Sequence, residues 1–276
     1  MNKKFILNFA PTGMIPTKEI TPYVPIRPEE IIDDVLSVVD VGITMVHLHV
    51  RNPATGEPTY KKDIYAEIIR GIRQREKNLI LCVSTSGRNF QEFEKRSECL
   101  RLDGELKPYF GSLTLSSLNN NQASINSPQM IQDLARMTLA RGIKSELEVF
   151  DLGMINYAKY LISKGLLKAP YYFNLILGNI ACAQADMLHL GLMINELPER
   201  SIWSVGGVGN YQLQMNVFAI VAGGGVRIGL EDNIWYDVER TSLATNRDLV
   251  ERIVSIAKSM GLEPYTPKEA RELLKL

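Results

Sequence analysis

Two histidines one residue apart make positions 45–56, MVHLHVRNPATG, the stretch of this chain with the clearest capacity for chemistry. The chain holds three histidines in all, and two of them are His47 and His49. Residues two apart share a face of a β-strand, and paired imidazoles are good ligands for first-row metals. The spacing predicts a strand with a metal-binding face. Ordinary polar residues on a half-buried strand are the structural alternative.

A carboxylate that would complete such a site stands at the end of another apolar run, GVRIGLED at 225–232. Two histidines, one glutamate and an open position form a known catalytic zinc set, so Glu231 is the candidate third ligand. In the structural alternative, this segment is a solvated turn with Asp232 or Asn233 as a helix N-cap. That alternative accounts for the aspartate and the asparagine but gives Glu231 no role.

Polar residues stand at the ends of two further apolar runs. Ser84 and Thr85 precede Gly87 in CVSTSGR, where the missing side chain would let a substrate approach the backbone. A simple serine-rich turn has the same composition. Glu146 and Glu148 share one face of the run ELEVFD.

Buried carboxylates are unfavourable unless they are paired, so at least one glutamate of that run is expected to meet a cation such as Arg227. A purely structural ion pair would satisfy the same requirement. Other features receive no catalytic role: Arg51 reads as a solvated loop residue, His189 as a histidine of a helix, and the glycines at 223–225 as a turn. The asparagine run at 119–121 indicates a loop.

Eight apolar, β-branched runs must position these groups, because each polar cluster stands where such a run ends. Each run is followed by a Gly, Ser, Asn or Pro break and then by a helical pattern, for example at 27–42 and 61–74. Strands that alternate with helices predict a parallel sheet, and eight such units in about 250 residues fit a (β/α)8 TIM barrel. The runs are FILNFAP, TMVHLHV, LILCVST, FGSLTLSS, ELEVFD, YYFNLIL, SIWSVGG and GVRIGLED.

We therefore predict one (β/α)8 domain over residues 1–276, with a C-terminal helical extension from RDLVERIVSIAKSMG to PKEARELLKL that closes or caps the barrel. The active site of such a barrel lies at the carboxyl ends of the strands, where the polar clusters stand. A doubly wound sheet is the alternative. The lack of a G-x-G-x-x-G motif after the first run weighs against it.

Composition indicates a cytoplasmic enzyme of small molecules. Lys+Arg 31 balance Asp+Glu 31, so neither nucleic acid nor an anionic membrane surface is favoured as a partner. No apolar stretch has the length of a signal peptide or a membrane span. The three cysteines, Cys82, Cys99 and Cys182, are widely spaced, and such a sparse, odd count suits a reducing compartment.

The motifs VHLHVR, VSTSGR, SLTLSSLN, ELEVFDLGM, FNLILG and RIGLEDNIWY, in this order and spacing, resemble the β-keto acid cleavage enzymes, the family of the 3-keto-5-aminohexanoate cleavage enzyme. The likeness covers nearly the entire chain. It implies a zinc-dependent (β/α)8 barrel that assembles as a homo-oligomer, commonly a tetramer. It also implies a reaction in which a β-keto acid and acetyl-CoA give acetoacetate and a new acyl-CoA.

The resemblance further implies roles for individual residues. The family's metal ligands fall on His47, His49 and Glu231. Its substrate contacts fall on Ser84, Gly87 and a position near Ser112, and its supporting glutamate, arginine and aspartate fall on Glu148, Arg227 and Asp232, with Glu146 as the alternative to Glu148.

One segment departs from the family pattern. The aminohexanoate enzyme carries a carboxylate in the loop after its first strand, where it meets the substrate's ammonium. Here that loop reads APTGMIPTKE, so Met14 and Ile15 are apolar and Glu19 lies several residues further on. An uncompensated ammonium would be held poorly there. We therefore predict a neutral or apolar β-keto acid as substrate.

These assignments give a mechanistic hypothesis. Zinc, as a Lewis acid, would hold the keto and carboxylate oxygens of the β-keto acid and acidify the carbon between them. Asp232, oriented by Arg227, would take the proton, while Ser84 and Ser112 would position the substrate carboxylate. The carbanion would attack acetyl-CoA, and the released CoA would return to the original keto carbon and free acetoacetate.

The sequence alone leaves two alternative functions open. A metal-dependent hydrolase of the amidohydrolase type also uses an H-x-H pair, but on its first strand and with further histidines on later strands. A non-catalytic metal- or metabolite-binding barrel is the other alternative. Product release that depends on both CoA and zinc would distinguish the proposed reaction from either one.

Overall fold

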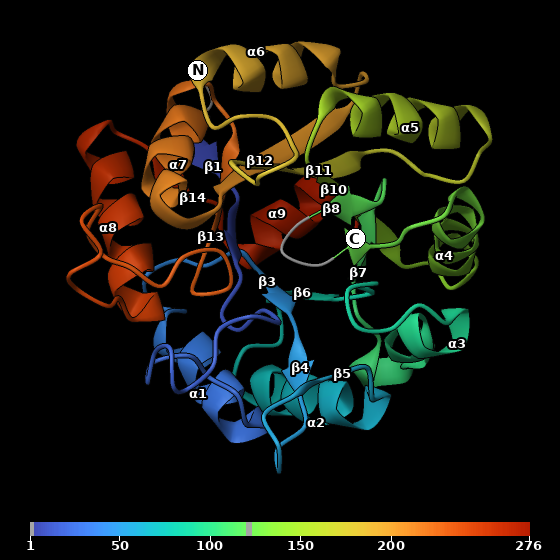
Figure 1. The fold of residues 1–276 in the computed structure, drawn as a ribbon, viewed down its shortest axis with the longest axis horizontal. Helices are drawn as coiled ribbons and strands as arrows, with labels where there is room; N and C mark the ends of the chain where they lie inside the picture. The colour runs from blue at the N-terminus through green and yellow to red at the C-terminus, as the bar shows by residue number, and fades with distance from the viewer. Residues whose placement is uncertain (1–2, 120–122) are drawn as a thin grey trace.

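The computed structural model describes residues 3–119 and 123–276, so positions 120 and 121 of the asparagine run lie outside the described residues. The fold is a closed barrel of eight parallel strands inside a ring of helices (Figure 1). Each of the eight expected runs supplies one barrel strand, which confirms the predicted (β/α)8 class. In order around the barrel these are β2 (Leu7–Phe9), β3 (Met45–Leu48), β6 (Ile80–Val83), β7 (Phe110–Thr114), β10 (Lys144–Val149), β11 (Tyr171–Leu177), β12 (Ser201–Gly207) and β13 (Gly225–Ile228).

The barrel closes where the last strand pairs with the first. Arg227 of β13 lies opposite Asn8 of β2, and Asn8 in turn lies opposite Met45 of β3. Residues far apart in the sequence therefore meet at the same barrel mouth. This closure brings the segment after β13 next to the segment after β3.

Helices cover the outer face of the strands (Figure 1). They are α1 (Pro28–Ser37), α2 (Lys62–Arg75), α3 (Phe93–Arg96), α4 (Pro128–Ala140), α5 (Leu152–Ser163), α6 (Met187–Glu196), α7 (Gln212–Val221) and α8 (Asn246–Ser259), with short 3-10 turns at Glu98–Arg101, Gly104–Leu106 and Gly209–Tyr211. Side chains of Ser127, Asp151 and Thr245 accept backbone hydrogen bonds at the starts of α4, α5 and α8, the capping that these residue types provide. The helix expected at 27–42 ends at Ser37, and a turn continues to Gly42, whose φ of +112° favours glycine.

The C-terminal extension contains two helices rather than one continuous helix. After α8, Gly261 adopts a φ of +74° in a turn, and β14 (Glu263–Pro264) pairs in parallel with β1 (Lys4–Phe5). Pro267 then begins α9 (Pro267–Leu274), because proline is tolerated in the first turn of a helix and not in its interior. In the view of Figure 1, helix α9 overlaps the centre of the barrel.

Helix α9 covers the amino-terminal end of the barrel. Ala270 and Leu274 are fully buried against inward-facing side chains near the starts of the strands, among them Met45 and Phe110. Burial of a leucine-sized side chain contributes roughly 1.5–3 kcal/mol. Apolar packing therefore closes this end.

The carboxyl ends of the strands carry two additional antiparallel pairs. Strand β4 (Val50–Arg51) pairs with β5 (Pro58–Thr59) directly after β3, and β8 (Leu118–Asn119) pairs with β9 (Ala123–Ser124) directly after β7. They extend the loops that surround the mouth. Among the described helices, none combines the length and the apolar character needed to cross a membrane.

Candidate metal centre and active site

The two histidines of the segment MVHLHVR project from the carboxyl end of β3 into the barrel. His47 is fully buried and His49 is 8 % exposed, and their ring centroids lie 5.1 Å apart. Val46 and Leu48 alternate with them and pack into the hydrophobic core on the other face. The period of two thus places the imidazoles side by side, as the sequence indicates.

Glu231 approaches the histidines from the turn that follows β13. Gly229 opens this turn with a φ of +150°, and Glu231 lies beyond the strand rather than in it. Its Oε1 atom is 3.2 Å from His49 Nε2 and 4.0 Å from His47 Nε2. One ligand atom from each of the three side chains lies within 4.8 Å of the others.

Two atoms of this cluster lack a hydrogen-bond partner within the part of the chain that the structure describes. They are His47 Nε2 and Glu231 Oε2, and both are buried. Buried polar atoms nearly always have a partner, so two unpartnered atoms on side chains whose ligand atoms lie within 4.8 Å of one another call for a further group. Two imidazole nitrogens and a carboxylate fit a divalent first-row metal with an open coordination position.

Glu146 determines the orientation of His47. Its Oε2 atom lies 2.5 Å from His47 Nδ1, and its Oε1 atom accepts hydrogen bonds from Asn8 and Asn174 at 2.8 and 2.7 Å. A carboxylate can only accept here, so the imidazole carries a proton on Nδ1 and leaves Nε2 on the side of Glu231, where a metal could bind in place of a proton. Glu146 therefore supports a histidine, whereas the sequence offered it only as the alternative to Glu148.

A second group of potential ligands, His47, Cys82 and Glu146, lies deeper in the barrel. Burial, together with the charge of Glu146, raises the pKa of the Cys82 thiol well above its ordinary value. The thiol stays protonated and donates a hydrogen bond to Glu146 at 3.1 Å. Since only a thiolate is a good metal ligand, this group serves as hydrogen-bonded support for the upper cluster.

Glu148 lies one layer above Glu146, on the same face of β10. It accepts a hydrogen bond from Thr114 at 2.7 Å, and its Oε1 atom is 3.9 Å from both His47 Nε2 and Arg227 Nη1. Of the two glutamates, it is Glu148 that faces the expected cation. It does so at ion-pair distance and without a hydrogen bond.

Arg227 connects the two carboxylates that follow β13. Its Nε donates to Asp232 at 2.8 Å and its Nη2 donates to Glu231 at 2.7 Å. Burial alone would lower the pKa of this guanidinium, but the charges of Asp232 and Glu231 raise it well above its ordinary value. Arg227 is therefore permanently charged and fixes both carboxylates in one geometry.

The acidic groups have divergent proton affinities. Burial raises the pKa of Glu231, but the charges of His49, Arg227 and His47 outweigh it and hold that pKa well below its ordinary value. For Asp232, burial and repulsion by Glu231 outweigh the attraction of Arg227, so its pKa is raised. Adjacent carboxylates with separated pKa values are a frequent property of catalytic sites. Glu231 is suited to bind a cation and Asp232 to accept a proton.

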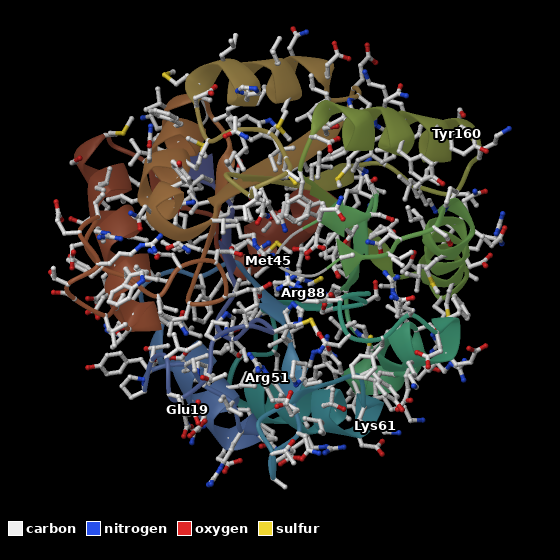
Figure 2. All side chains as sticks on the ribbon, viewed as in Figure 1. Glu19, Met45, Arg51, Lys61, Arg88 and Tyr160 are labelled. Carbon is white, nitrogen blue, oxygen red and sulfur yellow. The ribbon has the colours of Figure 1, made fainter. Side chains whose placement is uncertain are left out.

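A cavity of about 130 Å³ opens above this cluster at the carboxyl ends of the strands. Figure 2 shows Arg88 over the centre of the barrel and Glu19 at its periphery. Glu19 is exposed and is not part of the cavity wall. The wall includes Met14, Ile15, His49, Ser84, Ser86, Arg88, Thr114, Leu118, Ser124, Glu148, Phe150, Ile176, Asn179, Val208, Arg227, Glu231 and Asp232.

The three positions expected to contact the substrate occupy different depths. Ser84 lines the cavity at the end of β6. Ser112 lies below it, 2 % exposed, and its hydroxyl oxygen accepts a hydrogen bond from the Thr85 backbone N–H at 3.1 Å. Gly87 packs against Arg96 instead of opening toward the cavity: a Cβ atom there would lie 2.5 Å from Arg96 Nη1.

Sequence reasoning gave no role to three residues of the cavity wall, Arg88, Thr114 and Asn179. Each follows or ends a barrel strand, so the rule that active sites form at the carboxyl ends would have included them. Arg88 stands inside the motif VSTSGR, and Thr114 lies two residues after Ser112 on the same strand face.

Arg51 is a structural residue of the mouth, so its interpretation as a solvated loop residue is wrong. It is 1 % exposed, and its guanidinium donates to the carbonyl oxygens of Gly13, Pro16 and Gly56. These bonds hold the loop after β2 in place over the cavity. By contrast, His189 lies in α6, outside the cluster of His47, His49 and Glu231. Its side chain is half-exposed, and its Nδ1 atom is 2.8 Å from Asp186 Oδ2.

The family model for beta-keto acid cleavage enzymes matches residues 4–276. The chain belongs to the β-keto acid cleavage enzyme family. The resemblance carried by the motifs is thereby confirmed, and so is the prediction that the chain is an enzyme.

Relatives in this family match the chain from end to end. The 3-keto-5-aminohexanoate cleavage enzyme of Fusobacterium nucleatum is 37% identical over 279 residues, which cover 100% of this chain and 99% of that protein. The 3-dehydrocarnitine:acetyl-CoA trimethylamine transferase of Rhizobium meliloti is 31% identical over 296 residues, 100% of this chain and 98% of that protein. The solved ternary complex of ObcA with a C4-CoA adduct and oxalate has a TM-score of 0.79 at 21% identity, over 92% of this chain and 68% of that one, and supports the fold alone.

Proposed function

We propose that this chain exchanges acyl groups between a β-keto acid and acetyl-CoA, with a zinc ion bound by His47, His49 and Glu231. The observation that carries the proposal is the pair of buried, unpartnered atoms His47 Nε2 and Glu231 Oε2, in a cluster whose three side chains each offer a ligand atom within 4.8 Å of the others. The names of the relatives, several of which are acetyl-CoA transferases, support the same reaction class.

Zinc bound there would supply a Lewis acid that polarises the keto and carboxylate oxygens of the substrate. Asp232 is the base that takes a proton from the carbon between them, because its carboxylate lies beside the cluster and its pKa is raised. Arg227 is the positioning residue that holds Asp232 and Glu231. Glu148, hydrogen-bonded to Thr114, contributes negative charge opposite His47.

The bond changes balance without a further reactant. The substrate carbon that loses its proton forms a bond to the acetyl carbonyl carbon, and CoA leaves as a thiolate. The thiolate then adds to the original keto carbon, and the adjacent carbon–carbon bond breaks. Acetoacetate takes up the proton held by Asp232, and the remaining acyl group leaves as its CoA thioester.

The cavity wall supplies groups that would orient the substrate carboxylate. Ser84 and Arg88 lie on it, and a hydroxyl and a guanidinium together are suited to bind a carboxylate. Ser112 acts one layer below by shaping the turn at Thr85, and Gly87 gives Arg96 the space to pack there. Both are therefore proposed as positioning residues.

The apolar side chains of Met14 and Ile15 favour a neutral or apolar β-keto acid. They lie on the cavity wall, and the carboxylates nearest to the centre, Glu231 and Asp232, already pair with Arg227. A substrate ammonium beside Met14 and Ile15 would lose water without gaining a carboxylate partner from this loop, and Glu148, the remaining carboxylate of the wall, already accepts a hydrogen bond from Thr114. Relative turnover of aminated and plain β-keto acids tests this specificity, and a strong preference for the amine would contradict it.

We also propose that residues 1–276 form one folding unit that assembles as a tetramer, which light scattering of the purified protein would measure. The test of the function is acetoacetate formation from acetyl-CoA and a plain β-keto acid. Activity should disappear after chelation and return with zinc, and His47→Ala should lose metal and activity together. Hydrolysis that proceeds without CoA would instead support a hydrolase.

A further inference from the structure

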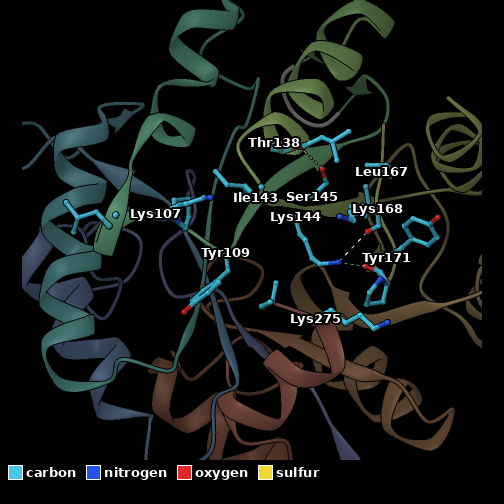
Figure 3. A pocket seen from close by; sticks show the side chains of 18 of the residues that line it. Lys107, Tyr109, Thr138, Ile143, Lys144, Ser145, Leu167, Lys168, Tyr171 and Lys275 are labelled. Carbon is cyan, nitrogen blue, oxygen red and sulfur yellow. Dashed lines mark hydrogen bonds between the residues drawn. The ribbon is translucent and has the colours of Figure 1, made fainter. Parts of the chain in front are cut away.

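A second and larger cavity, of about 1240 Å³, lies at the opposite end of the barrel from the candidate metal centre. It opens beneath β7, β10 and β11, where Tyr109, Lys144 and Tyr171 precede or begin these strands (Figure 3). The volume exceeds that of a phosphate or sulfate many times and is somewhat above the roughly 300–1,000 Å³ of usual small-molecule sites, so a nucleotide-sized ligand has enough space.

Seven cationic side chains line this cavity, against one acidic side chain, Glu105. None of the seven forms an ion pair with a carboxylate among the described residues, although the chain as a whole carries equal numbers of acidic and basic residues. The seven are Arg70, Arg73, Lys77, Lys107, Lys144, Lys168 and Lys275.

Lys144 is half-buried at the start of β10. Its Nζ atom donates only to the carbonyl oxygens of Lys168 and Pro170, at 3.4 and 3.1 Å (Figure 3). Burial, together with the charges of Lys168 and Lys275, lowers its pKa to about 8. The cluster therefore repels itself, and a bound anion would relieve this repulsion.

Apolar and aromatic side chains form the rest of the wall. Arg73 and Arg271 both lie over the ring of Tyr109, with guanidinium carbons 5.2 and 4.7 Å from its centroid. Such a wall favours a ligand that combines a flat or apolar part with several negative charges. The apolar members are Leu106, Pro108, Leu139, Ile143, Leu147, Leu166, Leu167, Ala169, Pro170 and Leu276.

A second copy of the chain is a poor occupant. A two-fold axis through this cavity would place the cluster against itself and bring seven further cations close to it, and lysine is depleted from interface cores. A small polyanion has the opposite charge and the required size.

We propose that this cavity binds a nucleoside polyphosphate, with the phosphates on Lys144, Lys168 and Lys275 and the base against the Tyr109 and Tyr171 side of the wall. This cavity shares no wall residue with the cavity above the candidate metal centre, and the proposal does not depend on the reaction proposed there. Strand β10 connects the two, because it begins at Lys144 and carries Glu146 to His47.

Calorimetry of the full chain with ATP, inorganic tripolyphosphate and adenosine tests the proposal. ATP is expected to bind, tripolyphosphate to bind more weakly, and adenosine alone more weakly still. Lys144→Gln and Lys168→Gln should each weaken ATP binding about tenfold, the effect of one charge-assisted hydrogen bond. Lys258→Gln removes an equal charge from the exposed face of α8 and should leave binding unchanged.

His47→Ala separates this site from the metal centre, since ATP can also bind a metal directly. ATP binding should persist in His47→Ala, and thermal melting should show that the exposed Lys168→Gln variant folds as the wild type does. Absence of ATP binding at about 1 mM, binding lost with His47, or binding insensitive to both lysine changes would overturn the proposal. Tripolyphosphate binding as tight as that of ATP would refute the nucleoside part of it.

Discussion

Replacement of Glu146 by glutamine tests whether this side chain fixes the metal-binding form of His47. Four donors meet the two carboxylate oxygens: Asn8 and Asn174 at Oε1, and His47 Nδ1 and the Cys82 thiol at Oε2. Glutamine keeps the shape but offers one acceptor oxygen and one NH2 group. The NH2 group must therefore face one of the two pairs of donors.

Each orientation has a measurable consequence. If the NH2 group faces His47, the ring must accept at Nδ1 and carry its proton on Nε2, which removes the lone pair that the metal needs. Loss of such a supporting contact lowers metal affinity by about 10–100-fold. If it faces Asn8 and Asn174, Asn174 loses its acceptor, whereas Asn8 still donates to Tyr172 and Asn174. A buried donor without a partner costs roughly 1–3 kcal/mol, so the free energy of unfolding falls by about that amount or more.

Two assays on Glu146→Gln separate these outcomes. Competition with a chromogenic chelator measures zinc affinity, and urea unfolding of the metal-free protein measures stability. Glu67→Gln makes the same chemical change on the exposed face of α2 and should alter neither quantity. The reasoning is refuted if Glu146→Gln binds zinc within about twofold of wild type and unfolds within about 0.5 kcal/mol of it.

Three further changes have defined outcomes. Asp232→Asn should lower turnover by about 10²–10⁴-fold while zinc stays bound, and normal turnover would exclude Asp232 as the base. Met14→Glu should raise turnover of aminated relative to plain β-keto acids, and an unchanged ratio would count against the role of this loop in specificity. Burial, only partly offset by a hydrogen bond from Asn246, raises the pKa of Asp34 to about 7 from its usual 3.8, so the folded state loses stability as the pH rises through this interval. Asp34→Asn should match wild type near pH 4 and exceed it by up to about 4 kcal/mol above pH 7 in urea unfolding; an equal gain at both pH values would contradict the shift.

Strand count and the direction of the histidines follow from local pattern. The alternation of His47 and His49 with Val46 and Leu48 is a property of adjacent residues, so the sequence determines their common face. The approach of Glu231 follows from the closure of an eight-stranded barrel, which the number of apolar runs indicates. These features were predictable because they depend on spacing and strand order alone.

Other features depend on contacts that spacing does not reveal. Glu146 and Glu148 have the same periodicity, and only the depth of each in the barrel decides that one meets His47 Nδ1 and the other Thr114. The residues that follow Arg51 in the sequence are typical of a loop. Arg51 is nevertheless buried, because the loop after β2 folds over it. In each case a partner distant in sequence determines the environment.

The central claim is tested most directly by following carbon from acetyl-CoA. The metal-loaded enzyme is incubated with acetyl-CoA labelled with ¹³C in both acetyl carbons and with a plain β-keto acid longer than acetoacetate, and the products are analysed by mass spectrometry. The account predicts acetoacetate that carries both labelled carbons, together with an unlabelled new acyl-CoA, and neither product from His47→Ala. Acetoacetate without label, or consumption of the β-keto acid in the absence of acetyl-CoA, would contradict it.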